Sequence, residues 1–137
     1  MKFVLDCSVT MAWCFEDEIN AYTEKILTAL QKNHEAKVPP LWKLEVINTL
    51  LGAQRKKRIS LFVANNFKNA LTSLPIYIDH TSTDRSFDTV FELAHQMQLS
   101  AYDAAYLELA FREKIPLATL DNALLKAAKK LNIERFL

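Results

Sequence analysis

Four acidic residues of this 137-residue chain have the chemistry and the placement to form one site: Asp6, Glu45, Asp103 and Asp121. Asp6 directly follows an apolar run, Asp121 directly follows LATL, and the other two fall near the starts of predicted helices. Carboxylates that share a site stay ionised only when something compensates their charge. A hard divalent cation such as Mg²⁺ or Mn²⁺ does this. The pattern therefore points to metal-assisted chemistry on a phosphate ester.

Each acid also has a purely structural explanation. Asp121 can cap a helix, Ser100 and Asp103 match a capping box, and Glu45 can complement a helix dipole. Taken singly, these explanations are at least as good as a functional one. The argument for a site rests on the four acids together.

The elements that must position these acids alternate along the chain. Strands are predicted at 2–5, 36–38, 76–78 and 117–120, with 133–136 as a candidate closing strand. Helices are predicted at 20–33, from about 40 to the basic run at 55–58, from a cap at Ser60 through 71, at 83–97, from a cap at Ser100 through 111, and at 121–131. Strands that alternate with helices predict an α/β fold of three layers (α/β/α), with a central parallel sheet of four to five strands. Ligands of such sheets bind at the carboxyl ends of the strands, so the acids are expected at one edge.

Composition and length exclude several classes of protein. The length predicts a single domain over residues 1–137. The only glycine, Gly52, excludes glycine-rich phosphate loops and dinucleotide fingerprints. The net charge of +1 gives no global basic footprint for nucleic acid. No signal peptide and no membrane-spanning run is evident, so a cytoplasmic location is expected. If Cys7 and Cys14 share a helix, they lie about 10 Å apart, beyond the roughly 7 Å limit for a disulfide.

Four blocks in order resemble a known family. The blocks are VLDCSV, PPLWKLEVINTL, LSAYDAAYLELA and PLATLDNALLKAA. Together they resemble PIN-domain ribonucleases, and they are most similar to the VapC toxins of bacterial toxin–antitoxin pairs. The resemblance covers the whole chain, and each block carries one of the four acids.

The resemblance implies roles for matching residues. Asp6, Glu45, Asp103 and Asp121 would hold Mg²⁺ or Mn²⁺. Ser8 and Thr119 match small hydroxyl positions beside the acids, and Asn48 matches a polar neighbour of Glu45. The family implies hydrolysis of RNA phosphodiester bonds, formation of homodimers, and inhibition by a cognate antitoxin protein whose tail enters the cleft. No further acid follows Asp121 closely, so a second metal ion would have fewer ligands, and the resemblance allows either one or two ions.

The roles of the individual groups are less constrained. An acid that is not fully engaged with metal could orient the attacking water, and Asp103 is the candidate. Basic residues that could bind RNA phosphates are Arg55, Lys56, Lys57, Arg58, Arg85, Arg112 and Lys114. For each of them a solvated helix end is the alternative. Trp13 and Trp42 could stack on bases, although core packing explains them as well.

Two other functions compete with RNA cleavage. A haloacid-dehalogenase-like phosphatase also places an aspartate after its first strand, but it needs a second aspartate where this chain has Ser8. A non-catalytic PIN-like module that only binds a protein partner would be expected to have lost acids, and all four are present.

Overall fold

The computed structural model describes residues 1–137 and contains one sheet of four parallel strands. The strands are β1 (Lys2–Leu5), β2 (Glu35–Val38), β3 (Ile76–Ile78) and β4 (Leu117–Ala118), in the order β3-β2-β1-β4. All three pairings are parallel, so the carboxyl ends of the strands lie at one edge. The predicted parallel α/β architecture is confirmed.

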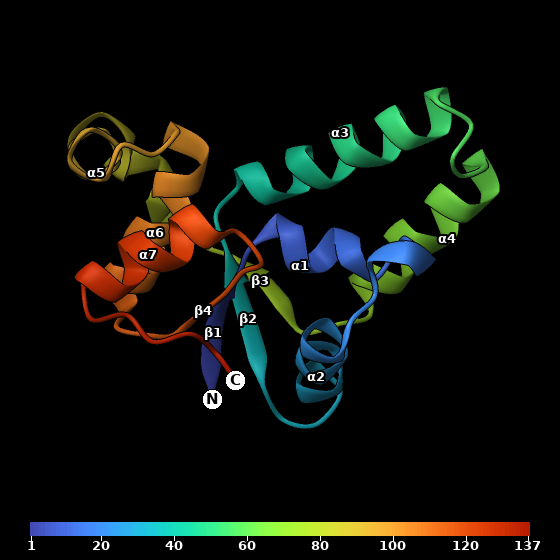
Figure 1. Ribbon diagram of the computed structural model, residues 1–137, viewed down its shortest axis with the longest axis horizontal. Helices are drawn as coiled ribbons and strands as arrows, with labels where there is room; N and C mark the ends of the chain where they lie inside the picture. The colour runs from blue at the N-terminus through green and yellow to red at the C-terminus, as the bar shows by residue number, and fades with distance from the viewer.

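Helices lie on both sides of this sheet (Figure 1). They are α1 (Cys7–Ala12), α2 (Ala21–Leu30), α3 (Leu41–Arg55), α4 (Leu61–Thr72), α5 (Phe91–Met97), α6 (Ala101–Glu113) and α7 (Asn122–Lys130). In Figure 1, α5, α6 and α7 lie to the left of the strands, and α1 to α4 lie to the right. No helix has the length and apolar character needed to cross a membrane.

The predicted closing strand at 133–136 is wrong. This segment makes a single bridge, between Leu117 and Arg135, with the Leu117 N–H donating to Glu134 and the Phe136 N–H donating to Leu117. A fifth strand needs a long partner, but β4 has only two residues because the chain turns away after Ala118.

The segment 83–97 is also not one α-helix. It begins earlier, as a 3₁₀ turn (His80–Arg85), continues through one π-helical turn (Ser86–Val90), and becomes α-helical only at Phe91. The early start has a local cause, because the Asp79 carboxylate accepts hydrogen bonds from the Ser82 N–H and hydroxyl. Helix α1 and the 3₁₀ turn at Glu16–Glu18 were not predicted, whereas the caps at Ser60 and Ser100 are confirmed.

The core is centred on β1 and α6. Phe3, Val4 and Leu5 have no exposed surface, and α6 buries Tyr106, Leu107 and Leu109 as completely. Helix α6 contacts both β1 and β4, and Asp103 in its first turn is close enough to feel the charges of Asp6 and Asp121. The two cysteines are both free.

A buried ionic network ties α6 to the end of β3. Arg112 pairs with Glu108 one turn earlier and with Asp79, and the Glu108 side chain is only 1% exposed. Lys37 on β2 pairs with Glu113 nearby. The suggestion that Arg112 binds RNA is therefore corrected, because its guanidinium neutralises carboxylates inside the fold.

Replacing Arg112 by alanine should destabilise the protein strongly. The change strands Glu108 and Asp79 without a counterion, and breaking a buried pair costs about 3–5 kcal/mol. Urea unfolding followed by circular dichroism measures the loss. The control is Arg58→Ala, which removes an exposed pair with Asp17 and Glu18 and should change stability far less. Similar losses in both variants would contradict a structural role for the network.

Candidate active site

Asp6 lies where β1 ends and α1 begins. Its backbone is extended, its N–H donates to the Ala118 carbonyl (2.9 Å), and its residue is only 5% exposed. The apolar run before it must be buried in the sheet, and the helix after it starts at once. The sequence thus fixes a carboxylate at the carboxyl edge of a central strand.

Two hydroxyl groups orient the Asp6 carboxylate. Ser8 and Thr119 both donate to its Oδ2 atom, at 2.6 and 2.7 Å. Each hydroxyl oxygen also accepts a backbone N–H at 3.0 Å, from Leu120 and Asp121 respectively. Because these N–H bonds occupy the hydroxyl oxygens as acceptors, the hydroxyl protons point to Asp6. The structure places both hydroxyls beside the acid, as the resemblance implied.

Glu45 reaches the same region from α3. The hydroxyl of Tyr106, a residue with no exposed surface, donates to Glu45 Oε1. Tyr106 is not among the site residues predicted from the sequence, although a tyrosine on the buried face of a helix is a signal, since its hydroxyl needs a hydrogen-bond partner. Asn48 is exposed and makes no hydrogen bond to Glu45, so the structure does not bring this predicted neighbour into the site.

Asp103 and Asp121 also take part in helix caps. The Asp103 N–H donates to Ser100 Oγ (3.1 Å), and Asp121 Oδ1 accepts the Leu124 N–H (3.0 Å). Both acids therefore have the capping contacts that the structural explanation predicted. Their carboxylates nevertheless lie close to the other acids and feel their negative charges. Burial raises the pKa of Asp103, and the negative charges of Asp6 and Asp121 raise it further.

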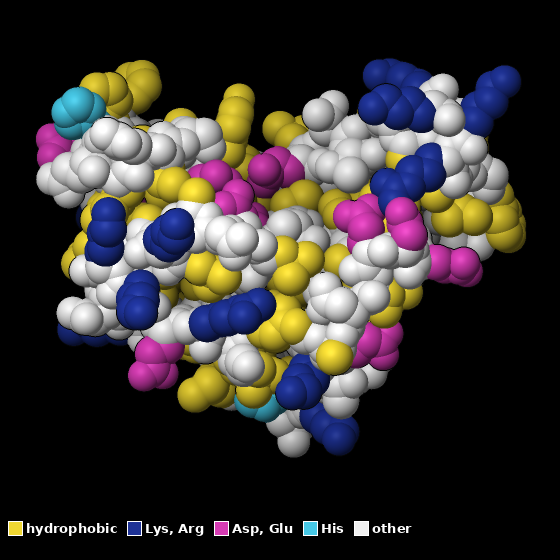
Figure 2. Space-filling view, in the orientation of Figure 1, with side chains coloured by type: hydrophobic (Ala, Val, Ile, Leu, Met, Phe, Trp, Pro, Cys, Tyr) yellow, Lys and Arg dark blue, Asp and Glu magenta, His cyan; other side chains and the backbone are white.

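The other two acids show the same electrostatic pattern. Burial raises the pKa of Asp6, Asp121 adds to the rise, and the hydroxyls of Ser8 and Thr119 oppose it. Burial likewise raises the pKa of Glu45, with Asp6 and Asp103 adding and Tyr106 opposing. None of the four acids forms an ion pair with lysine or arginine. Figure 2 shows acidic side chains together between α3 and the group of α5 to α7.

Asp79 shows what a compensated acid looks like in this fold. It follows β3 as Asp6 follows β1. Burial raises its pKa, but hydrogen bonds from Arg112 and Ser82 and the charge of Arg112 outweigh this, and the pKa is lowered. Asp79 and Asp6 both follow strands of the same parallel sheet, and they differ in that only Asp79 has an arginine partner.

The four carboxylates do not form a closed metal cage. No group of three or more acidic, histidine or cysteine side chains stands close enough to hold one ion. The expectation that the four acids share an ion stays a prediction. The structure places the four carboxylates at one edge of the sheet, where their negative charges act on one another and no lysine or arginine pairs with them.

The basic residues suggested for RNA binding lie in different surroundings. Arg58 pairs with Asp17 and Glu18, and its guanidinium lies 3.9 Å from the Phe15 ring centroid. Arg55, Lys56 and Lys57 are exposed at the far end of α3, and Arg85 and Lys114 are exposed elsewhere. Ten residues of α3 separate Arg55 from Glu45, a distance of roughly 15 Å along the helix.

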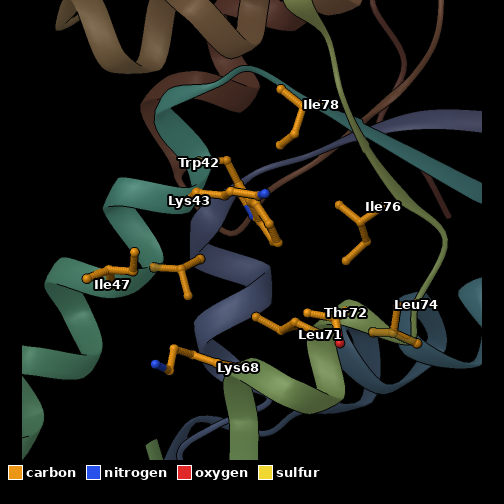
Figure 3. Close-up of a pocket in the computed structure, with 10 residues that line it drawn as sticks. Trp42, Lys43, Ile47, Lys68, Leu71, Thr72, Leu74, Ile76 and Ile78 are labelled. Carbon is orange, nitrogen blue, oxygen red and sulfur yellow. The ribbon is translucent and has the colours of Figure 1, made fainter. Parts of the chain in front are cut away.

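An apolar groove lies apart from the acids, between α3, α4 and β3 (Figure 3). Its volume is about 370 Å³. Trp42, Ile47, Leu71 and Ile76 line it, with Lys43 and Lys68 at its sides. Trp42 is buried and donates from its indole N–H to Thr10, and Trp13 donates to the Thr23 carbonyl, so both indoles are structural.

Comparison with known proteins gives the family. Residues 3–130 match the model of the PIN domain, and the chain belongs to the PIN-domain family. The structure is similar to PAE2754 from Pyrobaculum aerophilum, with a TM-score of 0.68 and 23% identity over 93% of this chain and 79% of that one. It is also similar to VapBC2 from Rickettsia felis, solved with a promoter DNA fragment, with a TM-score of 0.67 and 15% identity over 99% of this chain and 98% of that one. These identities show the fold alone, and no curated protein sequence matches.

The raised pKa of Asp6 predicts a pH-dependent cost to stability. A carboxyl with a higher pKa in the folded state binds its proton more tightly when folded, so stability falls as pH rises from the ordinary range near 4 through the raised pKa. Without metal at about pH 7, Asp6→Asn should therefore stabilise the protein and raise the urea concentration at the midpoint of unfolding.

The pH profile provides the check. In EDTA, urea unfolding should show the advantage of Asp6→Asn shrinking as pH falls toward about 4. Asp84→Asn, at an exposed position without an ion pair, serves as the control and should stay near the wild type throughout. An advantage of Asp6→Asn that does not change with pH would contradict the electrostatic cause.

Proposed function

We propose that this PIN-domain protein is an endoribonuclease that depends on Mg²⁺ or Mn²⁺ and hydrolyses RNA phosphodiester bonds. The observation that carries the proposal is the set of coupled, uncompensated carboxylates at the carboxyl edge of the sheet, with Asp6 held by two hydroxyls. PIN domains are typically metal-dependent nucleases, which agrees with this chemistry. Because the chain belongs to the PIN-domain family, the alternative of a haloacid-dehalogenase-like phosphatase is not supported.

The donor set fits a divalent cation in its chemistry. Asp6, Glu45, Asp103 and Asp121 offer only hard oxygen ligands, and none of them pairs with lysine or arginine. Burial, with the charges of neighbouring acids adding to it, raises the pKa of Asp6, Glu45 and Asp103. These four residues would hold the ion. When bound, the ion supplies charge for the phosphate oxygens and lowers the pKa of water.

Other residues of the chain position these carboxylates, and one acid is suited to orient the attacking water. Ser8 and Thr119 hold Asp6 by its Oδ2 atom, which keeps the carboxylate plane fixed. Tyr106 holds Glu45 by Oε1. No residue of another element donates a hydrogen bond to the Asp103 carboxylate, unlike those of Asp6 and Glu45. Its raised pKa suits Asp103 to orient the attacking water and to accept a proton from it at a carboxylate oxygen.

A role as a toxin inhibited by a cognate antitoxin is the finer part of the proposal. The similar VapBC2 structure, by its description, contains a promoter fragment bound to that pair. In this chain, α3 and α4 expose large apolar side chains such as Leu44, Leu61 and Phe62, the last being 74% exposed. Apolar surface of this kind is typical of a partner interface. It supports an antitoxin or homodimer contact, and it equally suits the alternative of a non-catalytic interaction module.

Metal-dependent cleavage separates the enzyme from the module. The purified protein should cleave RNA with Mg²⁺ or Mn²⁺ and be silent in EDTA. Asp6→Asn keeps the shape and removes one ligand charge, so cleavage should fall on the order of 10²-fold or more. Gel assays on a labelled RNA measure this, with Asp84→Asn as the control that should retain full activity.

The same variants are informative in cells. Expression of the wild type without a partner should arrest growth, and Asp6→Asn should not. Cleavage that survives EDTA would refute the metal dependence. Full metal-dependent activity in Asp6→Asn would refute the role of Asp6.

Tyr106→Phe tests the positioning of Glu45. Phenylalanine fills the same buried space but releases the Glu45 carboxylate, and loss of such a supporting contact typically weakens metal binding roughly 10- to 100-fold. Titration of cleavage against Mn²⁺ should show a higher half-saturating concentration with a maximal rate that largely recovers. Tyr77→Phe, at an exposed tyrosine without a hydrogen bond, is the matched control. An unchanged Mn²⁺ requirement in Tyr106→Phe would exclude the positioning role.

A further inference from the structure

Helix α7 presents a basic face that the sequence reading did not select. Lys126, Lys129 and Lys130 are exposed and spaced i, i+3 and i+4, so they share one side of the helix. The opposite side of α7 buries Leu124, and Arg135 follows just beyond the helix. Figure 2 shows basic side chains over α7, on the same face of the molecule as the acids between α7 and α3.

Lys126, Lys129 and Lys130 form no ion pair within the fold. The ion pairs of the structure involve only Lys37, Arg58 and Arg112 among the basic residues. Lys129 and Lys130 complement the carboxyl end of the helix dipole, which is a structural use. That use does not extend to Lys126 in the middle of the helix or to Arg135 outside it.

The basic face starts beside the acid cluster. Asp121 is the cap of α7, so the helix runs directly away from the candidate active site. With a rise of about 1.5 Å per residue, Lys126 lies about 7.5 Å and Lys130 about 13.5 Å along the axis from Asp121. A chain with repeated negative charges could thus contact several of these cations while one of its groups lies at the acids.

A surface hollow adds a second, independent feature. It has a volume of about 480 Å³ and lies between the end of α7 and the C-terminal segment. Lys129 and Arg135 line it together with Asn132 and one acid, Glu134. The Arg135 guanidinium lies 3.7 Å from the Tyr22 ring centroid, which restricts its motion and keeps it at this place. Two cations and one acid leave the hollow with net positive charge suited to a phosphate.

We propose that this α7 face, formed by Lys126, Lys129, Lys130 and Arg135, binds the backbone phosphates of the RNA strand whose scissile bond lies at the acid cluster. The inference rests on the proposed function for the identity of the strand. The acids and the RNA phosphates carry like charges, so exposed cations beside the acids favour binding of the strand, and Lys126, Lys129 and Lys130 are in no ion pair. Lysine acts on phosphate as a point charge, so the face adds affinity without reading bases.

The salt dependence of binding tests this face. The probe is a labelled single-stranded RNA of about 20 nucleotides, with the protein in EDTA so that nothing is cleaved. Neutralising three phosphate contacts in Lys126→Gln/Lys129→Gln/Lys130→Gln should reduce the slope of log K against log salt by about 2. At about 0.05 M salt this corresponds to binding weaker on the order of 10²-fold. Fluorescence anisotropy gives both quantities, and circular dichroism confirms folding of the variant.

The matched control removes the same charge elsewhere. Lys2→Gln/Lys25→Gln/Lys32→Gln, at exposed positions at the start of β1, in α2 and just after α2, should leave the slope close to that of the wild type. An unchanged slope in the α7 variant overturns the proposal. An equal reduction in both variants also overturns it, because only net charge would then matter.

Two further outcomes separate the alternatives. If a polyglutamate peptide binds the α7 face more tightly than the RNA does, the face serves an acidic polypeptide and the proposal fails. If the wild type cleaves RNA with Mg²⁺ but the α7 variant keeps its slope, only this inference fails. If the wild type cleaves no RNA while the α7 variant loses the slope, the proposed activity fails and the binding face stands.

Discussion

The burial of the Asp6 carboxylate at the end of a central strand is the constraint on which the site depends. A charge with 5% exposure is unfavourable unless polar groups surround it, and here Ser8 and Thr119 supply the hydrogen bonds. Thr119 follows β4, which pairs with β1 in parallel, so the second hydroxyl is delivered by the sheet itself. The parallel register and the orientation of the acid are therefore one arrangement.

Acids of this fold with and without a cationic partner have different effects on stability. Asp79 is neutralised by Arg112 and fastens β3 to α6. Asp6, Glu45 and Asp103 are left with raised pKa values and no cation from the protein. Such a cluster lowers stability in the absence of a ligand, and a protein retains that cost where a bound cation or substrate group compensates it.

Helix α6 connects the site to the rest of the molecule. Its first turn carries Asp103, its buried middle carries Tyr106 against Glu45, and its end carries the Arg112 network. The neighbouring α7 begins at Asp121 and carries the exposed lysines outward. The buried helix α6 and the exposed helix α7 thus begin at the same edge of the sheet. Helix α6 holds the acids in position, and α7 carries the positive charges.

The sequence by itself predicted the parallel α/β fold and the places of the four acids at strand ends and helix starts, because strand and helix periods and the ends of apolar runs are local features. The positions of the hydroxyls of Ser8 and Thr119 were implied by the family resemblance. It did not determine which strand-end acid is compensated, since Arg112 lies 33 residues from Asp79 and only packing brings them together. Nor could it give the contact between Tyr106 and Glu45, which joins residues 61 positions apart. Whether IERF forms a strand depended on the length of its partner β4, and which lysines are unpaired depended on the positions of all the acids. These properties belong to tertiary structure because each depends on groups that the chain brings together only on folding.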